Sequence, residues 1–280
     1  MNKSPEAGYA LGYTAEEHTR LMRQAALLAP CTERLFRAAG IGPGDRVLDL
    51  GSGVGDVSLL LGQIVGPAGA VVGIERNRNS IARAEARVAA AGLSNVSFLE
   101  SDAMEVAVSG SFDAVVGRFI LMYLPQPART LRGLTALLRP QGAVAFLEPS
   151  WAAARGLSAH LPLYSACAAA IIETFRSCGV NPEMGTAMHR VFADAGLPIP
   201  ALNIDILLGA DEEFTRALCD ILQSLAPEAR QNGISLEALG DLSTLGKRLQ
   251  AEVHGSGDVI AWLAGHVGAW CRFAGEGARP

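Results

Sequence analysis

The sequence predicts an α/β fold in which a mostly parallel sheet is covered by helices on both faces. Short apolar runs typical of buried strands alternate along residues 41–150 with segments whose apolar residues recur at helical spacing. Several strands end in an acidic residue, and one of them runs directly into the glycine-rich turn Gly51–Gly55. Ligands of open α/β sheets bind at the carboxyl ends of the strands, so these ends are the expected site.

The N-terminal segment is expected to be helical. Thr14–Glu17 has the form of a capping box, which opens a helix, and Leu21 and Leu28 then belong to an apolar face at helical spacing. Pro30 is expected to break this helix, because proline lacks the N–H that a helix interior requires. A second helix is then predicted up to Gly40.

Five strands alternating with helices are predicted next. The expected strands are 46–50, 70–75, 95–100, 112–117 and 142–148, and the expected helices are 56–65, 80–91 and 127–138. After residue 149 the pattern becomes mainly helical. Helices are predicted at 158–178, 183–195 and 211–251, with strands at 202–208 and 259–263.

The glycine-rich turn distinguishes two classes of nucleotide site. A dinucleotide fingerprint, G-x-G-x-x-G, would place its third glycine at position 56, where this chain has Asp56. Asp49, two residues before Gly51, is also foreign to that pattern. The turn instead resembles motif I of the class I S-adenosylmethionine-dependent methyltransferases, which has the form D-x-G-x-G.

Further matches extend this resemblance over roughly residues 40–149. Glu75 ends the second strand, where the family has an acid that holds the ribose hydroxyls; a carboxylate suits a vicinal diol because it accepts two hydrogen bonds. Asp102 and Ala103 match the pair that reads the adenine edge, and the segment at Arg118 and Phe119 resembles motif IV. The resemblance implies a Rossmann-like methyltransferase fold with a seven-stranded sheet and S-adenosyl-L-methionine as cofactor.

The N-terminal helices resemble the lid of a bacterial subgroup of small-molecule methyltransferases that are ubiquinone/menaquinone C-methyltransferase-like. This resemblance makes the lid residues candidates for ligand contacts, Tyr13 and Gln24 toward the cofactor and Tyr9 toward the substrate. The cofactor-binding residues that the combined resemblance implies are Asp49, Gly51, Ser52, Gly53, Glu75, Arg76, Asp102, Ala103, Arg118, Phe119, Gln24 and Tyr13.

Methyl transfer depends mainly on alignment and exclusion of water, so a dedicated base is optional. If the acceptor needs one, the candidates are His18 in the lid, His160 after the fifth strand and Glu148 at its end. Trp151 and Tyr164 are candidates for an aromatic wall of the substrate pocket, although their spacing also fits core packing.

Composition restricts the possible partners. A net charge of −5 and a pI near 5.6, without any basic run, argue against nucleic acid. The five cysteines contain no C-x-x-C pair, so no metal site is expected. Without a signal-like or membrane-spanning segment, a cytoplasmic protein is expected, as a monomer or a homodimer.

The sequence is therefore interpreted as four segments: a helical lid at 1–40, the cofactor-binding core at 41–150, a helical substrate cap inserted at 151–200, and strands and helices at 201–280 that complete the sheet. The expected activity is methyl transfer from S-adenosylmethionine to a small secondary-metabolite or quinone-like acceptor. An NAD-dependent oxidoreductase and a non-catalytic cofactor-binding protein of the same fold stay open as alternatives.

Overall fold

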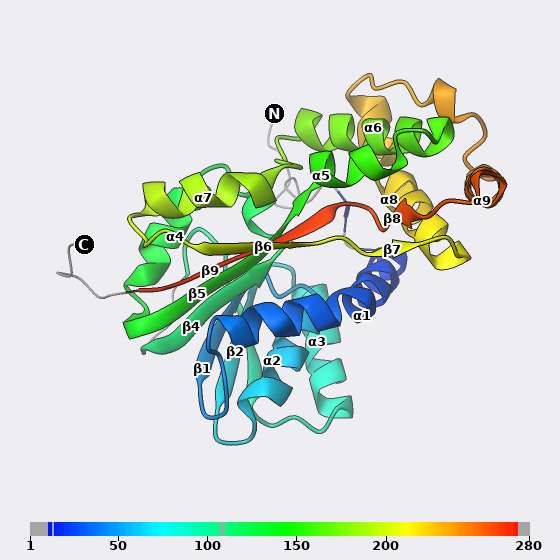
Figure 1. Cartoon of the computed structure of the whole chain (residues 1–280). Coiled ribbons are helices and arrows are strands. Elements are labelled where there is room, and N and C mark those ends of the chain that lie inside the picture. The colour runs from blue at the N-terminus through cyan, green and yellow to red at the C-terminus, as the bar shows by residue number, and fades with distance from the viewer. Residues whose placement is uncertain (1–10, 13, 107, 109, 274–280) are drawn as a thin grey trace.

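A seven-stranded sheet forms the centre of the molecule in the computed structural model, which describes residues 11–12, 14–106, 108 and 110–273. Its strands are β1 (Arg46–Leu50), β2 (Ala70–Glu75), β3 (Val96–Glu100), β4 (Phe112–Arg118), β5 (Leu138–Ser150), β6 (Ala201–Asp205) and β9 (Gly265–Arg272). Their order is β3-β2-β1-β4-β5-β9-β6 (Figure 1). The pairs from β3 to β5 are parallel, whereas β9 runs antiparallel to β5 and β6. The predicted mostly parallel α/β fold is confirmed.

Strand β9 is the largest departure from the sequence-based prediction. The predicted strand at 259–263 contains only β8 (Ile260–Ala261), which pairs with β7 (Leu208–Gly209) in a separate small sheet. The strand predicted at 202–208 is likewise replaced by β6, which ends at Asp205. Glycines obscure the pattern of β9. At Gly268 a Cβ would lie 2.4 Å from Asn203 Oδ1 and 3.0 Å from Leu35 Cδ1, so a side chain there would displace its neighbours.

Helices cover both faces of the sheet. On one side lie α1 (Ala15–Ala38), α2 (Asp56–Val65) and α3 (Arg78–Ala90), and on the other lie α4 (Pro127–Thr135) and α7 (Met184–Ala195), which pack against each other (Figure 1). Each helix has an apolar face toward the sheet; in α2, for example, Val57 and Leu61 are buried. This arrangement gives the parallel strands the double cover that they require.

The predicted break at Pro30 is wrong, since α1 runs through it as one helix. Buried residues lie on both sides of the proline: Leu28 and Phe36 have no exposed surface and Leu35 has 2%. Proline removes one hydrogen bond from a helix interior, but the packing of this continuous apolar face outweighs that loss.

A helical cap lies at one end of the sheet, beyond the carboxyl ends of the parallel strands (Figure 1). It consists of α5 (Trp151–Arg155), η2 (Gly156–Ser158), α6 (Pro162–Ser177), α8 (Glu212–Gln231), η3 (Glu237–Leu239) and α9 (Leu245–Ser256). The single helix predicted at 211–251 is therefore two helices. Gly233 and Gly240, both with positive φ, lie in the connection that separates them.

The strand order reverses between β1 and β4, which are neighbours in the sheet. Loops after these two strands therefore diverge to opposite faces and leave a crevice at their carboxyl ends. The four segment boundaries proposed from the sequence stay a prediction. Within the described residues, no helix is both long and apolar enough to cross a membrane.

Candidate functional site

A cavity of about 420 Å³ lies at this reversal point, enclosed by the strand ends, α1 and the helical cap. Ligand sites in proteins commonly have volumes of about 300–1,000 Å³. Twelve of the residues predicted for the site line it, namely His18, Gln24, Gly51, Ser52, Gly53, Glu75, Arg76, Asp102, Ala103, Arg118, Phe119 and Trp151. Segments far apart in the sequence thus meet at one cavity.

The glycine-rich turn forms one wall. Gly51 and Gly53 both have positive φ, at 69° and 53°. A Cβ at Gly51 would lie 2.7 Å from the Ile120 side chain, whereas a Cβ at Gly53 would meet nothing within 4 Å. Gly51 is therefore required by the protein's own packing, and Gly53 leaves open space on the cavity side. Between them, the buried Ser52 Oγ has no hydrogen-bond partner among the described residues.

Glu75 lies at the end of β2 with its carboxylate beside this turn. Its Oε2 accepts from the Gly53 N–H at 3.0 Å, and its Oε1 accepts from the N–H groups of Arg76 and Asn77 at 2.9 and 2.8 Å. These backbone donors fix the carboxylate at the cavity wall. A carboxylate has about four lone-pair positions, so it can still accept from ligand hydroxyls.

Asp102 and Ala103 follow β3 and line the same wall. Asp102 Oδ1 accepts from the Met104 N–H at 2.8 Å, which shapes the turn and leaves Oδ2 for a ligand. Glu75 and Glu100 are register partners at the ends of β2 and β3. Glu75 therefore lies near the loop that follows β3 and carries Asp102 and Ala103.

Arg118, at the end of β4, brings a positive charge to the cavity beside the glycine-rich turn. Its Nη1 donates to Thr32 Oγ1 of α1 at 3.2 Å.

Asp49 lies behind the turn and does not line the cavity: it is 1% exposed and its Oδ2 accepts from Ser58 Oγ at 2.6 Å. Burial raises the pKa of Asp49 to about 7, while Ser58 and Arg118 act in the opposite direction. Asp49 therefore bonds to α2 behind the turn, and its predicted contact with the cofactor stays a prediction.

Glu148 is not placed to act as a base, because it is fully buried and does not line the cavity. Its carboxylate accepts from the N–H groups of Ile120, Leu121 and Met122 at 2.9, 2.8 and 3.2 Å. Burial raises its pKa to about 8, against the effect of these donors. The carboxylate fastens the turn after Phe119, which has a strained φ of 55°.

The end of the cavity beyond Phe119 is aromatic. The His266 ring neighbours those of Phe119 and Trp262, with centroid distances of 5.8 and 5.7 Å. Two described non-glycine residues of the wall have a positive φ: Phe119 and, directly after Trp262, Leu263, with φ of 60°. Further apolar lining comes from Met122, Trp151, Phe175 and Ile221.

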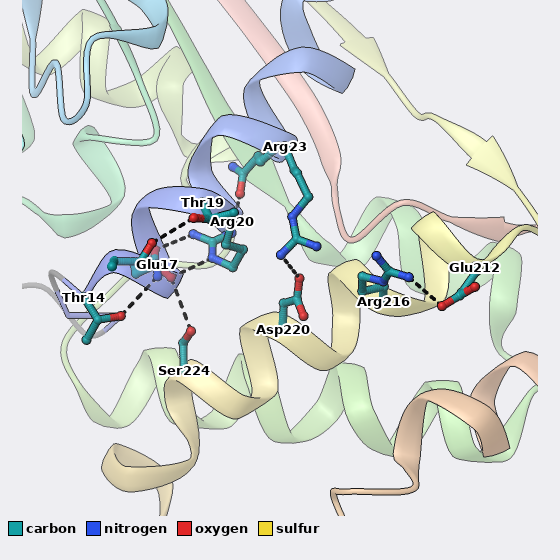
Figure 2. Close-up of polar contacts among 11 residues, drawn as sticks. Thr14, Glu17, Thr19, Arg20, Arg23, Glu212, Arg216, Asp220 and Ser224 are labelled. Atoms are coloured by element: carbon teal, nitrogen blue, oxygen red, sulfur yellow. Dashed lines mark hydrogen bonds and ion pairs between the residues drawn. The ribbon is translucent and has the colours of Figure 1, made fainter. Parts of the chain in front are cut away.

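Helix α1 covers the cavity and is fastened to α8 of the cap (Figure 2). Arg20 forms a buried pair with Glu17, with a distance of 2.6 Å between Nη2 and Oε1, and it donates to Gln24 at 2.5 Å. Ser224 of α8 donates to Glu17 at 3.3 Å, and Arg23 pairs with Asp220 of α8 at 2.8 Å. The predicted lid helix and the cap therefore close the cavity together.

The remaining predicted residues lie elsewhere. His160 is half-exposed and pairs with Asp258 at 2.9 Å, outside the cavity wall. Tyr164 is buried and donates to the Ala261 carbonyl at 3.0 Å, which anchors the segment before Trp262. Tyr9 and Tyr13 lie outside the described residues.

His18 lines the cavity on the side of Glu75, with Nε2 3.3 Å from Ser80 Oγ. Burial and Arg83 lower its pKa, and Glu17 and Glu75 act in the opposite direction. It therefore lies beside the predicted ribose position rather than in the aromatic end, where an acceptor would require a base.

Sequence reasoning missed Trp262 and His266. Both lie in or just before β9, the strand that the pattern did not reveal, so nothing placed them at the cavity. The signal was the buried run Ile260–Cys271, in which only Trp270 is partly exposed. Among the described residues, no group of three or more His, Cys, Asp or Glu could hold a metal ion.

Comparisons with known proteins identify the family of this chain. Residues 41–196, more than half of the chain, match the family described as "Methyltransferase domain". A demethylmenaquinone methyltransferase from Bacillus cytotoxicus is 33% identical over 116 residues, covering 41% of this chain and 49% of that protein. One from Staphylococcus aureus is 33% identical over 119 residues, covering 42% and 48%. The match thus spans about half the length of these curated relatives.

Solved structures share the fold over most of the chain. A Bacillus halodurans structure described as a methyltransferase is 16% identical, with a TM-score of 0.58 and coverage of 86% of this chain and 97% of that chain. The YcgJ protein from Bacillus subtilis is 13% identical, with a TM-score of 0.53 and coverage of 87% and 98%. At these identities the likeness concerns the fold alone. The family match decides the assignment: this chain belongs to the methyltransferase domain family, and so to the class I S-adenosylmethionine-dependent methyltransferases.

Proposed function

We propose that this cavity binds S-adenosyl-L-methionine and that the protein transfers its methyl group to a small, mainly apolar acceptor. One continuous cavity with two chemically different ends carries the proposal. Polar groups at the ends of β1, β2 and β3 form one end, and aromatic rings form the other. A cofactor bound across the strand ends would direct its reactive group toward the aromatic end.

The residues of the polar end fit this cofactor group by group. Glu75 would accept from the two ribose hydroxyls, since its backbone donors leave lone pairs free. Asp102 and the Ala103 N–H would meet the adenine edge. Arg118 would hold the carboxylate of the methionine part, because a guanidinium pairs with a carboxylate bidentately.

Two features of the glycine-rich turn support the fit. The space beside Gly53 is open, so a ligand can approach the backbone there. The buried Ser52 Oγ, which lacks a partner in the described part of the chain, gains one if a polar ligand fills the cavity. Both observations concern the same turn that carries the motif I resemblance.

When bound, S-adenosylmethionine supplies an activated methyl group on a sulfonium sulfur. The contribution of the protein would be to align the acceptor and to exclude water. Helix α1, tied to α8 by Glu17 and Arg23, would serve as the cover. The aromatic faces of Phe119 and Trp262 suit both a flat acceptor and a neighbouring cation.

The acceptor class is proposed from the aromatic end and from the named relatives. Relatives named demethylmenaquinone methyltransferase, 33% identical over part of the chain, favour a quinone-like ring. Apolar lining by Trp151, Phe175 and Ile221 accommodates such a ring or a similar secondary metabolite. A cytoplasmic location, a monomer or homodimer, and the lack of a nucleic-acid partner stay predictions.

Isothermal calorimetry tests the cofactor proposal. S-adenosylhomocysteine, the demethylated product, should bind the wild-type protein, and NADH should not. Glu75→Ala should weaken the binding by about 1–3 kcal/mol, because the ribose hydroxyls lose a charged acceptor. Glu100→Ala is the matched control: it removes the acid at the register partner of Glu75 on β3, which does not line the cavity. Binding of NADH alone, or equal effects of the two variants, would contradict the proposal.

A further inference from the structure

The aromatic end of the cavity contains two polar atoms without partners. Trp262 Nε1 and His266 Nδ1 are buried and form no hydrogen bond with any residue that the structure describes. The two side chains are only 2% and 1% exposed, and their ring centroids lie 5.7 Å apart. Buried polar groups are nearly always paired, so the unpaired Trp262 Nε1 at a cavity indicates a ligand that carries a polar atom, whereas the Asp205 backbone, which acts on the His266 ring, can pair with Nδ1.

The chemistry of the two side chains restricts that ligand. Tryptophan can only donate, so Trp262 requires an acceptor atom. A neutral imidazole has one donor and one acceptor nitrogen. If Nδ1 pairs with the Asp205 backbone, Nε2 is the nitrogen left to meet a ligand in the cavity.

His266 is held in its neutral form. Burial, and to a smaller extent Arg118, lowers its pKa to about 4, while the backbone and the side chain of Asp205 act in the opposite direction. Strand β6 brings Asp205 into register with His266. A proton on Nδ1 can use the Asp205 carbonyl, which leaves the Nε2 lone pair for the ligand.

A hydroxyl group satisfies both requirements at once, because it donates one hydrogen bond and accepts others. The rest of this end is apolar and flat, with Phe119, Trp151 and Phe175 in the wall. We propose that the methyl acceptor is a planar molecule with an ionisable hydroxyl, a phenol or an enol, and that the hydroxyl donates to His266 Nε2 and accepts from Trp262 Nε1–H. This inference rests on the proposed methyl transfer and specifies its acceptor.

The role of His266 is to take the hydroxyl proton. As the acceptor attacks, its O–H bond breaks and an N–H bond forms at Nε2, so the oxygen retains the bonding pair. That pair, at the oxygen or at a conjugated ring carbon, forms the bond to the methyl carbon, and the pair of the broken sulfur–carbon bond stays on sulfur. The imidazolium then releases its proton to water; if carbon is methylated, that ring carbon also loses its proton and the oxygen regains one. Trp262 stabilises the oxygen while negative charge develops on it.

Two probes that differ only in the hydroxyl hydrogen test the proposal. We would titrate α-naphthol and its methyl ether by calorimetry into the full chain saturated with S-adenosylhomocysteine. The ether can accept from Trp262 but cannot donate to His266. The wild-type protein should therefore bind α-naphthol about tenfold more tightly than the ether.

Variants assign this preference to residues. In His266→Phe the preference for α-naphthol should disappear, and in His266→Gln it should partly return, since an amide oxygen accepts the hydrogen bond. Trp262→Phe should weaken both probes, because both have an oxygen that accepts from the indole. The Trp262 indole N–H resonance, assigned by its loss in that variant, should shift when either probe binds.

Three results would overturn the inference: no binding of α-naphthol, equal binding of the two probes to the wild-type protein, or a preference that survives in His266→Phe. Binding of S-adenosylhomocysteine to each variant checks that it is folded. Failure of the wild-type protein to bind S-adenosylhomocysteine would instead contradict the proposed function. The two failures are therefore distinguishable.

Discussion

At the scale of single residues, the glycine-rich turn contains glycines with different reasons to be glycine. Gly51 is fixed by Ile120, which leaves no room for a Cβ. Gly53 has free space around it, so only its positive φ and an incoming ligand oppose a side chain. This difference makes Gly53 the better probe of cofactor binding.

We predict that Gly53→Ala weakens binding of S-adenosylhomocysteine by about tenfold or more, because the methyl group occupies the space that the ligand needs. Stability should fall by about 1–2 kcal/mol from the positive φ alone. Gly92→Ala is the matched control, since Gly92 has φ of 68°, nothing within 4 Å of a Cβ, and no place in the cavity wall. Calorimetry and urea unfolding measure both quantities; equal losses of affinity in the two variants would remove Gly53 from the site.

The sequence was informative for residues that follow predicted strands directly. Glu75, Asp102 and Arg118 could be predicted because each ends a strand or lies within two residues of its end, and such ends meet at one edge of the sheet. His18 could be placed near the cavity but not on a particular side of it, since that depends on how α1 crosses the sheet. Glu148 lies at a strand end too, yet its side chain turns inward to the 120–122 amides.

At the scale of elements, α1 joins the sheet to the cap. Its C-terminal half packs on the sheet through Leu35 and Phe36, and its first turns carry the buried pair of Glu17 and Arg20 toward α8 (Figure 2). A buried ion pair contributes little to the free energy of unfolding when it is intact. Loss of one partner is destabilising, because the other charge then stays buried without a counter-charge. The cover of the cavity therefore depends on an intact pair.

Glu17→Ala should lower the free energy of unfolding by about 3 kcal/mol, because Arg20 stays buried without its carboxylate. Glu33→Ala removes the acid of an exposed pair on the same helix, 2.7 Å from Arg37, and should change the free energy by less than about 1 kcal/mol. Urea unfolding of both variants measures the difference. If the two losses are similar, the Glu17–Arg20 pair does not hold the cover.

Element prediction succeeded where one periodicity dominated. The strands β1, β2 and β4 are short apolar runs between clear turns, and their predicted ranges agree with the structure to within one residue. It failed at Pro30, where packing on both sides maintains the helix, and at β9, where the fold requires glycines that weaken a strand pattern. Trp262 and His266 were missed for the second reason.

At the scale of the whole molecule, the site is a consequence of topology. The sheet reverses its order between β1 and β4, and the antiparallel β9 then places His266 beside Phe119, 147 residues earlier in the chain. A polar end lined by residues of 51–118 thus adjoins an aromatic end, to which β9 contributes His266 and the segment before it contributes Trp262. The residues of the polar end belong to motifs that can be recognised in the sequence. Those of the aromatic end, Trp262 and His266, reach the cavity only through the tertiary fold.

A crystal structure of the protein with S-adenosylhomocysteine would test the proposed site. We expect the ribose hydroxyls on Glu75, the adenine at Asp102 and Ala103, and the sulfur beside Phe119 facing Trp262 and His266. A nucleoside bound outside this cavity, or a sulfur directed away from the aromatic end, would contradict it.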